Sequence, residues 1–170
     1  MRKIYTNTMM VLMLALTMMT FTSCDKDTML AIDLDGVWAG TVVGDYYYDR
    51  YGLAGDVYDT ELCFYQSGDF SKGGTGYQID RNRVTRQYTR YSFEWRVSNQ
   101  RIHIYYDDGY EIIIRDYEIY EVGRTLRFRG YFDDAYDGTQ LASFDLIKTT
   151  NMRSVADEEG AVEVSKEDFK

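Results

Sequence analysis

The sequence predicts an all-β protein built as one antiparallel, up-and-down barrel of eight strands. Apolar and polar residues alternate through much of residues 34–149, and this period of two is typical of strands with one buried face. Short turn sequences such as Asp107-Asp108-Gly109 separate the alternating segments. The chain of 170 residues contains no proline, a residue that guards exposed sheet edges in many β proteins. Its absence favours a closed barrel, which has no edges.

Residues 1–23 have the organisation of a secretion signal and are not expected to belong to the barrel. Arg2 and Lys3 form a basic start, residues 9–19 are almost entirely apolar, and small residues precede Cys24. The apolar run is too short for a stable membrane-spanning helix. We expect residues 24–33 to form a tether between this signal and the barrel.

Cys24 resembles the acylated cysteine of bacterial lipoproteins, with Phe21 at the position of the usual leucine. The acidic residues that follow, interrupted by Lys26, are similar to the surface-export signals of Bacteroidetes lipoproteins. This resemblance implies a palmitate-type lipid anchor on Cys24 in the outer membrane, and it leaves open whether the protein faces the periplasm or the cell surface. Cys63 would then have no intramolecular partner, and we expect it to be a buried thiol in a strand.

Turn sequences and changes of phase divide residues 34–149 into eight predicted strands. In the fourth, Phe93 and Trp95 share one face and polar residues occupy the other. In the sixth, the apolar phase shifts after Ile114, which predicts a β-bulge near Arg115 and Asp116. The predicted strands span residues 34–43, 58–66, 74–79, 91–98, 101–106, 110–121, 125–133 and 140–149.

The connection between the first two predicted strands is an unusual tyrosine-rich loop over residues 44–56. It carries Tyr46, Tyr47, Tyr48 and Tyr51 among aspartate and arginine residues. Tyrosine is enriched at recognition surfaces because its ring stacks and its hydroxyl forms hydrogen bonds. These four residues are therefore candidates for a patch that binds sugar rings or a partner protein. In the other interpretation, two of the tyrosines close the barrel mouth as part of the core.

The alternation also predicts which side chains face the barrel interior, which is wide enough to be filled or to hold one small ligand. The predicted inward set is Trp38, Leu62, Phe64, Tyr77, Phe93, Trp95, Ile102, Ile104, Ile112, Leu126, Phe128, Phe132, Phe144 and Leu146. Nearly all are large, and glycine is the main source of space. The sequence is compatible both with a filled barrel and with a barrel that contains a cavity. For a cavity, the candidate ligand contacts, in the interior or at the mouth, are Trp38, Phe64, Tyr77, Trp95 and Phe128.

Residues 150–170 are acidic and polar, and we expect them to form a mobile tail, although Ser154–Val164 could form a short helix.

The overall charge limits the possible partners. The formal net charge is −9, and removal of residues 1–23 takes away two basic residues and no acidic ones, which leaves −11. Such a charge disfavours binding to nucleic acid and electrostatic attraction to anionic lipid or polyanionic glycan.

The sequence favours binding over catalysis. His103 is the only histidine, and it is expected to be exposed on the strand face opposite Ile102 and Ile104, so no catalytic set can be assembled around it. No metal site or cofactor is predicted, because the acidic clusters lack the spacing of calcium loops. We expect solvated rims at Asp45, Asp49, Asp56 and Asp59 and at Asp133, Asp134 and Asp137, and a solvated basic loop over residues 80–90.

Residues 34–149 also resemble lipocalins. Gly36-Val37-Trp38 is similar to the G-x-W motif, whose tryptophan packs across the closed end of the lipocalin barrel, and Asp116-Tyr117 is similar to part of the later T-D-Y element. The resemblance implies a lipocalin-like barrel that binds a small apolar or amphipathic ligand. The alternative is a non-catalytic interaction lipoprotein whose barrel is filled and whose tyrosine-rich loop contacts an envelope glycan or protein.

Overall fold

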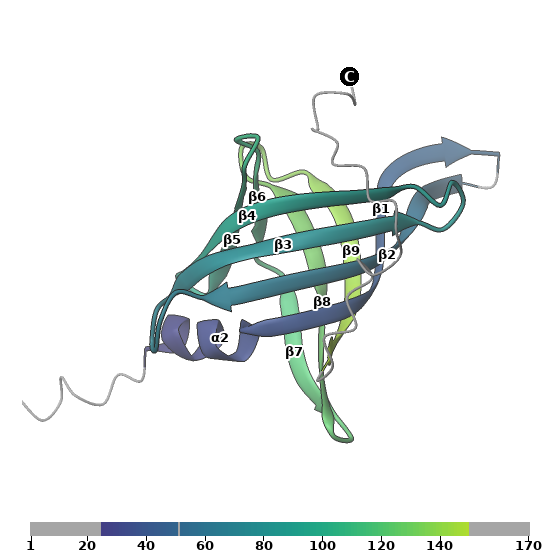
Figure 1. Cartoon of the computed structure of the whole chain (residues 1–170). Coiled ribbons are helices and arrows are strands. Elements are labelled where there is room, and N and C mark those ends of the chain that lie inside the picture. Colours follow the sequence, from purple (N-terminus) through teal and green to yellow (C-terminus); the bar gives the residue numbers. More distant parts are fainter. Residues whose placement is uncertain (1–24, 51, 150–170) are drawn as a thin grey trace, which may run out of the picture.

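The computed structural model describes residues 25–50 and 52–149, and for residues 45–49, 52 and 53 it describes the backbone alone. The predicted signal, Cys24 and the acidic tail lie outside the described residues. The helix and strands shown in Figure 1 are α2 (Lys26–Leu34), β1 (Gly36–Asp49), β2 (Gly52–Gln66), β3 (Gly73–Asn82), β4 (Tyr88–Ser98), β5 (Arg101–Tyr106), β6 (Glu111–Ile114), β7 (Tyr117–Val122), β8 (Thr125–Asp134) and β9 (Gln140–Thr149).

The strands form one antiparallel sheet that closes into a barrel. β1 to β6 pair in chain order, β8 pairs with β9, β9 pairs with β1, and β6 pairs with β8 to close the ring. β7 follows β6 along the same side of β8, so the two share one position in the ring. The ring therefore has eight positions, and the predicted up-and-down barrel is confirmed.

A bulge separates β6 from β7, as the shift of apolar phase predicts. Ile113 lies opposite Asp133, and Tyr117 lies opposite Gly130. The chain thus advances four residues on the β6–β7 side while β8 advances three. One extra residue on one strand of a pair is a β-bulge, and here the bulge includes Arg115 and Asp116, which connect β6 to β7.

Aromatic rings fill much of the barrel interior. The ring centroids of Trp38 and Phe128 lie 5.3 Å apart, as do those of Phe64 and Trp95, and both pairs pack edge to face. Glycine does not leave space beside them. A Cβ atom at Gly76 would lie 2.3 Å from the ring of Phe93, so this ring occupies the room that the missing side chain provides. The packing favours the filled barrel of the two alternatives.

The expected tether is wrong for residues 26–33, because these residues belong to helix α2. Asp25 is the N-cap, and its carboxylate accepts a hydrogen bond from the backbone N–H of Asp27. Leu30, Ala31 and Leu34 are buried in the same core cluster as the barrel interior. A nine-residue helix is marginal by itself, so its burial against the barrel stabilises it.

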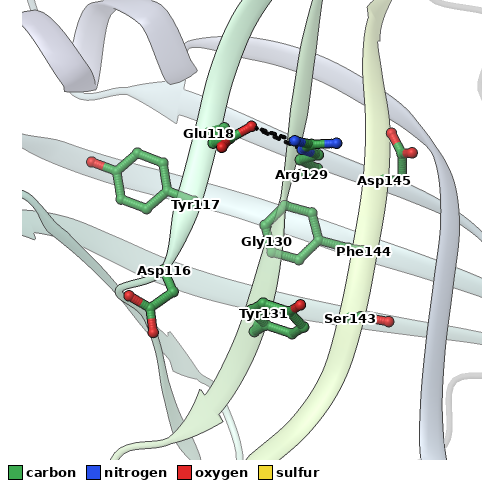
Figure 2. A pocket seen from close by; sticks show the side chains of 9 residues that line it. All are labelled: Asp116, Tyr117, Glu118, Arg129, Gly130, Tyr131, Ser143, Phe144 and Asp145. Carbon is green, nitrogen blue, oxygen red and sulfur yellow. Dashed lines mark hydrogen bonds and ion pairs between the residues drawn. The ribbon is translucent and has the colours of Figure 1, made fainter.

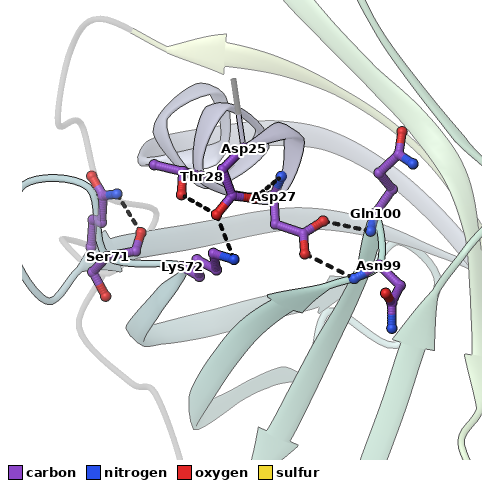
Figure 3. A network of polar contacts seen from close by, with 8 residues as sticks. Asp25, Asp27, Thr28, Ser71, Lys72, Asn99 and Gln100 are labelled. Atoms are coloured by element: carbon purple, nitrogen blue, oxygen red, sulfur yellow. Dashed lines mark hydrogen bonds and ion pairs between the residues drawn. The ribbon is translucent and has the colours of Figure 1, made fainter. Parts of the chain in front are cut away.

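Side chains and backbone groups fix α2 across one end of the barrel (Figures 1 and 3). The Asp27 carboxylate accepts hydrogen bonds from the backbone N–H groups of Asn99, at 2.9 Å, and Gln100, at 2.7 Å, in the β4–β5 turn. Asp25 forms an ion pair with Lys72 beside β3. We call this the plugged end. The β2–β3, β4–β5 and β7–β8 turns belong to it, and the other turns lie at the opposite end, the mouth.

The predicted tyrosine-rich loop is mostly strand. β1 and β2 continue as a hairpin, in which Tyr47 lies opposite Ala54 and Asp49 lies opposite Gly52, after a shift of register beyond Gly44. Tyrosine favours extended backbone, and antiparallel pairing satisfies the hydrogen-bonding groups that a loop would leave to water. The basic loop is also shorter than predicted, because β3 ends at Asn82 and β4 begins at Tyr88.

Candidate functional site

Four of the five predicted ligand contacts are core residues. Trp38, Phe64, Trp95 and Phe128 are almost completely buried. The two indole N–H groups are already paired, since Trp38 donates to the carbonyl oxygen of Leu34 at 2.8 Å and Trp95 donates to that of Thr75 at 3.0 Å. Trp38 therefore joins the barrel to α2. These side chains hold the barrel together and have no polar atom left for a ligand.

Tyr77, the fifth predicted contact, is on the outside of the barrel, so its inward assignment is wrong. Gly76 and Gln78 occupy the inner face, and Tyr77 lies opposite Cys63 on the outer face. Its hydroxyl donates a hydrogen bond to Glu61 Oε1 at 2.7 Å, and burial together with this carboxylate raises the pKa of Tyr77. Cys63 is fully buried, which confirms the predicted buried thiol, and burial raises its pKa.

The tyrosine-rich segment is placed only in part. The backbone positions of Tyr46, Tyr47 and Tyr48 lie in β1 near the tip of the hairpin. Their side chains, and the whole of Tyr51, lie outside the described residues. A recognition patch there stays a prediction.

His103 is less exposed than predicted. Its Nδ1 atom lies 3.0 Å from Glu111 Oε1, and its ring stacks on Tyr105. Two of the predicted acidic rim residues form ion pairs, Asp59 with Arg83 and Asp133 with Arg115. Asp133 is also buried, so the predicted solvated rim is wrong at this residue. Across the described parts of the chain, no three His, Cys, Asp or Glu side chains are grouped closely enough to hold a metal ion.

A groove of about 500 Å³ runs over the outside of β7, β8 and β9 (Figure 2). Its polar side chains form rows, because residues opposite one another on paired strands face the same side. Glu118 is opposite Arg129, which in turn is opposite Asp145, and Tyr131 is opposite Ser143 in the next row. The lining residues are Asp116, Tyr117, Glu118, Arg129, Gly130, Tyr131, Ser143, Phe144 and Asp145. We call this the outer groove.

Exposed ion pairs dominate the electrostatics of the outer groove. Arg129 Nε donates to Glu118 Oε2 at 2.9 Å, and this hydrogen bond raises the pKa of Arg129. Arg127, in the neighbouring position of β8, forms a bidentate pair with Asp145 and lowers the pKa of that carboxyl. Exposed pairs of this kind contribute little to stability, because water and salt screen them. A bound ligand can therefore exchange hydrogen bonds with them at little cost.

Gly130 and the β-bulge give the outer groove its shape. A Cβ atom at Gly130 would lie 2.6 Å from the carbonyl oxygen of Asp116, 2.9 Å from Tyr117 Cβ and 3.0 Å from Phe144 Cζ. Only glycine lets β7 approach β8 this closely while the Phe144 ring covers the position from inside. The bulge then turns the exposed Asp116 toward the groove (Figure 2).

A second polar cluster lies inside the barrel, toward the mouth. The hydroxyl of Thr60 donates to Asp80 Oδ1 at 2.6 Å, and Gln78 Nε2 donates to Asp80 Oδ2 at 2.7 Å. Tyr106 then donates its hydroxyl proton to Gln78 Oε1 at 2.6 Å. Burial, followed by the charge of Asp80, raises the pKa of Tyr106 well above its ordinary value. This chain of hydrogen bonds is the inner polar cluster.

The prediction from sequence located neither of these two polar clusters. The outer groove depends on strand register, which decides that Glu118, Arg129 and Asp145 are neighbours. The one available signal was the predicted bulge near Asp116, since bulges are common beside functional sites. No protein-family model, curated protein or solved structure matches this chain. No helix within residues 25–50 and 52–149 is long and apolar enough to cross a bilayer.

Proposed function

We propose that this protein is a non-catalytic, lipid-anchored β-barrel of the outer membrane that binds a neutral envelope glycan in the outer groove. The observation that carries the proposal is the contrast between the two sides of the sheet. Interlocking aromatic rings occupy the inside, whereas the groove outside combines concave shape with exposed polar side chains. The binding surface is thus the groove, and the barrel serves as its rigid support.

The chemistry of the outer groove suits a polyhydroxylated ligand. Pockets for apolar molecules are lined mainly by hydrophobic side chains, whereas the lining of this groove includes three carboxylates, an arginine and three hydroxyl groups. Carboxylates accept hydrogen bonds from sugar hydroxyls and arginine donates to them. The exposed ring of Tyr131 offers a flat apolar surface for a sugar face. Three carboxylates against one arginine disfavour an anionic glycan.

The binding experiment compares two tyrosines of equal exposure. Tyr131 in the groove is 42% exposed, and Tyr105, on β5 outside the groove, is 41% exposed. With neutral oligosaccharides of two to four glucose, galactose or N-acetylglucosamine units as probes, we expect Tyr131→Ser to weaken binding about tenfold in calorimetry. Tyr105→Ser should bind like the wild type. If the wild type binds none of the probes at millimolar concentration, or if both variants lose affinity equally, the proposal is wrong.

The membrane anchor is supported by the sequence around Cys24 and by the position of α2. Asp25, the residue after Cys24, caps the helix at the plugged end. An acylated Cys24 would then join the folded domain with no spacer. We expect the mature protein from its host to begin at Cys24 and to carry acyl chains detectable by mass spectrometry, and Cys24→Ser to leave the membrane fraction. A mature wild-type chain without added lipid mass would contradict the anchor.

A second candidate function is favoured by the inner polar cluster. A carboxylate that faces the inside of a barrel near its mouth is suited to the polar head of a small amphipathic ligand, in keeping with the lipocalin resemblance. Such a ligand would enter from the mouth, above the aromatic core. A hydroxyl or ammonium head group would match Asp80 in hydrogen bonding.

A further inference from the structure

Helix α2 has exposed apolar residues on the side that faces away from the barrel. Met29 is 47% exposed and Ile32 is 38% exposed, whereas Leu30, Ala31 and Leu34 are buried. Met29 and Ile32 are three residues apart and are therefore neighbours on the helix surface. A helix at the surface of a water-soluble domain normally presents polar residues to water. The outer side of α2 departs from this pattern.

The β2–β3 turn presents a further large apolar side chain at the same end. Phe70 is 74% exposed and its φ angle is +64°, a left-handed conformation that bulky residues disfavour. The turn adjoins the helix, because Lys72 forms an ion pair with Asp25, the N-cap of α2 (Figure 3). An exposed phenylalanine in a disfavoured conformation has no role in the packing of the barrel.

The tip of the β7–β8 hairpin adds Val122, which is 48% exposed at the plugged end (Figure 1). Several polar groups of this end are engaged with one another. Asp25 is paired with Lys72, the Asp27 carboxylate is held by two backbone N–H groups, and Lys148 Nζ donates to the carbonyl oxygen of Asp33. The exposed apolar side chains therefore lie near the carboxylates of Asp25 and Asp27, which already have partners within the protein.

We propose that the plugged end lies against a lipid bilayer, with Phe70, Met29, Ile32 and Val122 in the headgroup region. This inference rests on the proposed acylation of Cys24. Consecutive Cα atoms are about 3.8 Å apart, so an anchor on Cys24 would hold the N-cap of α2 at the membrane surface. Interfacial helices bury their apolar side about 5–10 Å deep at the boundary between headgroups and acyl chains. The mouth and the tyrosine-rich hairpin then point away from the membrane.

The proposed anchor favours a lipid bilayer over a protein partner or a second copy of the chain at this surface. Tethering raises the local concentration of the surface to which the chain is attached, so weak apolar contacts that would fail in solution become occupied. A protein partner or a second copy of the chain would have to compete for side chains that the anchor already holds beside lipid. The same geometry fixes the orientation of the outer groove relative to the membrane.

The experiment places a fluorescent reporter at each end of the barrel. The chain from Cys24 to Lys170 is coupled through the Cys24 thiol to a maleimide lipid in phosphatidylcholine vesicles with brominated acyl chains, and Cys63, which is fully buried, is protected from coupling. Phe70→Trp reports on the plugged end, and Met29→Trp is a second reporter in case the turn does not tolerate tryptophan. Tyr136→Trp, at a 99% exposed position in the β8–β9 turn, is the matched control at the mouth.

We expect bromine to quench the fluorescence added by Phe70→Trp or by Met29→Trp by at least half and to leave that of the mouth reporter unchanged. Equal quenching at both ends, or none at the plugged end, would overturn the proposal. Self-association on the vesicles without quenching would assign the surface to a second copy and would also overturn it. Because the coupling is chemical, the result does not depend on natural acylation, which the mass of the host-derived protein tests separately.

Discussion

At the scale of single residues, the buried polar groups of the barrel are stabilised by specific partners. Thr60, Gln78 and Tyr106 are buried, and each has a hydrogen bond within the inner polar cluster. Buried polar groups need such partners, because an unsatisfied one costs about 1–3 kcal/mol. Tyrosine is useful here since its ring packs against the apolar layer while its hydroxyl reaches a carboxylate or an amide.

Tyr110 gives a pH dependence that can be measured. Its hydroxyl donates to Asp134 Oδ2 at 2.9 Å, and burial together with this carboxylate raises its pKa from 10.0 to about 12. The folded state therefore holds this proton more tightly than the unfolded state does. The resulting stabilisation is complete below pH 10 and is lost as the pH rises from 10 to about 12.

We expect the free energy of unfolding in urea to fall more steeply from pH 10 to 12 in the wild type than in Tyr110→Phe, by about 1 kcal/mol once solvent screening is allowed for. Tyr136→Phe removes a fully solvated hydroxyl. It should therefore follow the wild type, because it keeps Tyr110 and its hydrogen bond to Asp134. Parallel curves for the wild type and Tyr110→Phe would exclude this role for Tyr110.

At the scale of elements, α2 is held to the barrel by both apolar and polar contacts. Leu30, Ala31 and Leu34 bury one side of the helix, and Asp27 reaches the β4–β5 turn. Asn99 and Gln100 both have positive φ angles there, so their backbone N–H groups point together toward the carboxylate. The helix and the turn thus stabilise each other's conformation.

Asp27→Ala should lower the free energy of unfolding by about 1–2 kcal/mol, because it removes two charge-assisted hydrogen bonds from the backbone. The matched control is Asp33→Ala, which removes an exposed carboxylate from the last turn of the same helix and should cost nothing or stabilise slightly. Urea unfolding of both variants measures the two changes in the free energy of unfolding. Equal losses would mean that Asp27 acts only through the general charge of the helix.

At the scale of the whole molecule, the two ends of the barrel differ in chemistry. The plugged end combines a helix that packs against the barrel on one side with exposed apolar side chains, and the mouth carries the tyrosine-rich hairpin above the inner polar cluster. The outer groove lies on the side wall formed by β7, β8 and β9. In the proposed anchored orientation, both candidate binding surfaces stay accessible while the plugged end meets the membrane.

The second candidate function makes its own prediction at this scale. If an amphipathic ligand occupies the mouth, the mature protein purified gently from its host should carry a discrete small molecule in native mass spectrometry. Asp80→Asn should release it, and Asp69→Asn, a change in the exposed β2–β3 turn, should retain it. A bare protein mass, with no thermal stabilisation by long-chain amines or alcohols, would leave the outer groove as the binding site.

The amino-acid sequence alone was enough to predict the barrel, the number of positions in its ring and most of its interior. Alternation marks a strand wherever one face is buried, and the change of phase after Ile114 marks the bulge, because both are local properties of the chain. Other features follow from the tertiary structure. Helix α2 forms because the barrel end buries it, and Tyr77 is outside because Gly76 beside it faces inward and accommodates the ring of Phe93. The outer groove exists because strand register brings Glu118, Arg129 and Asp145 together. Each of these depends on contacts between residues far apart in the chain, which no local pattern specifies.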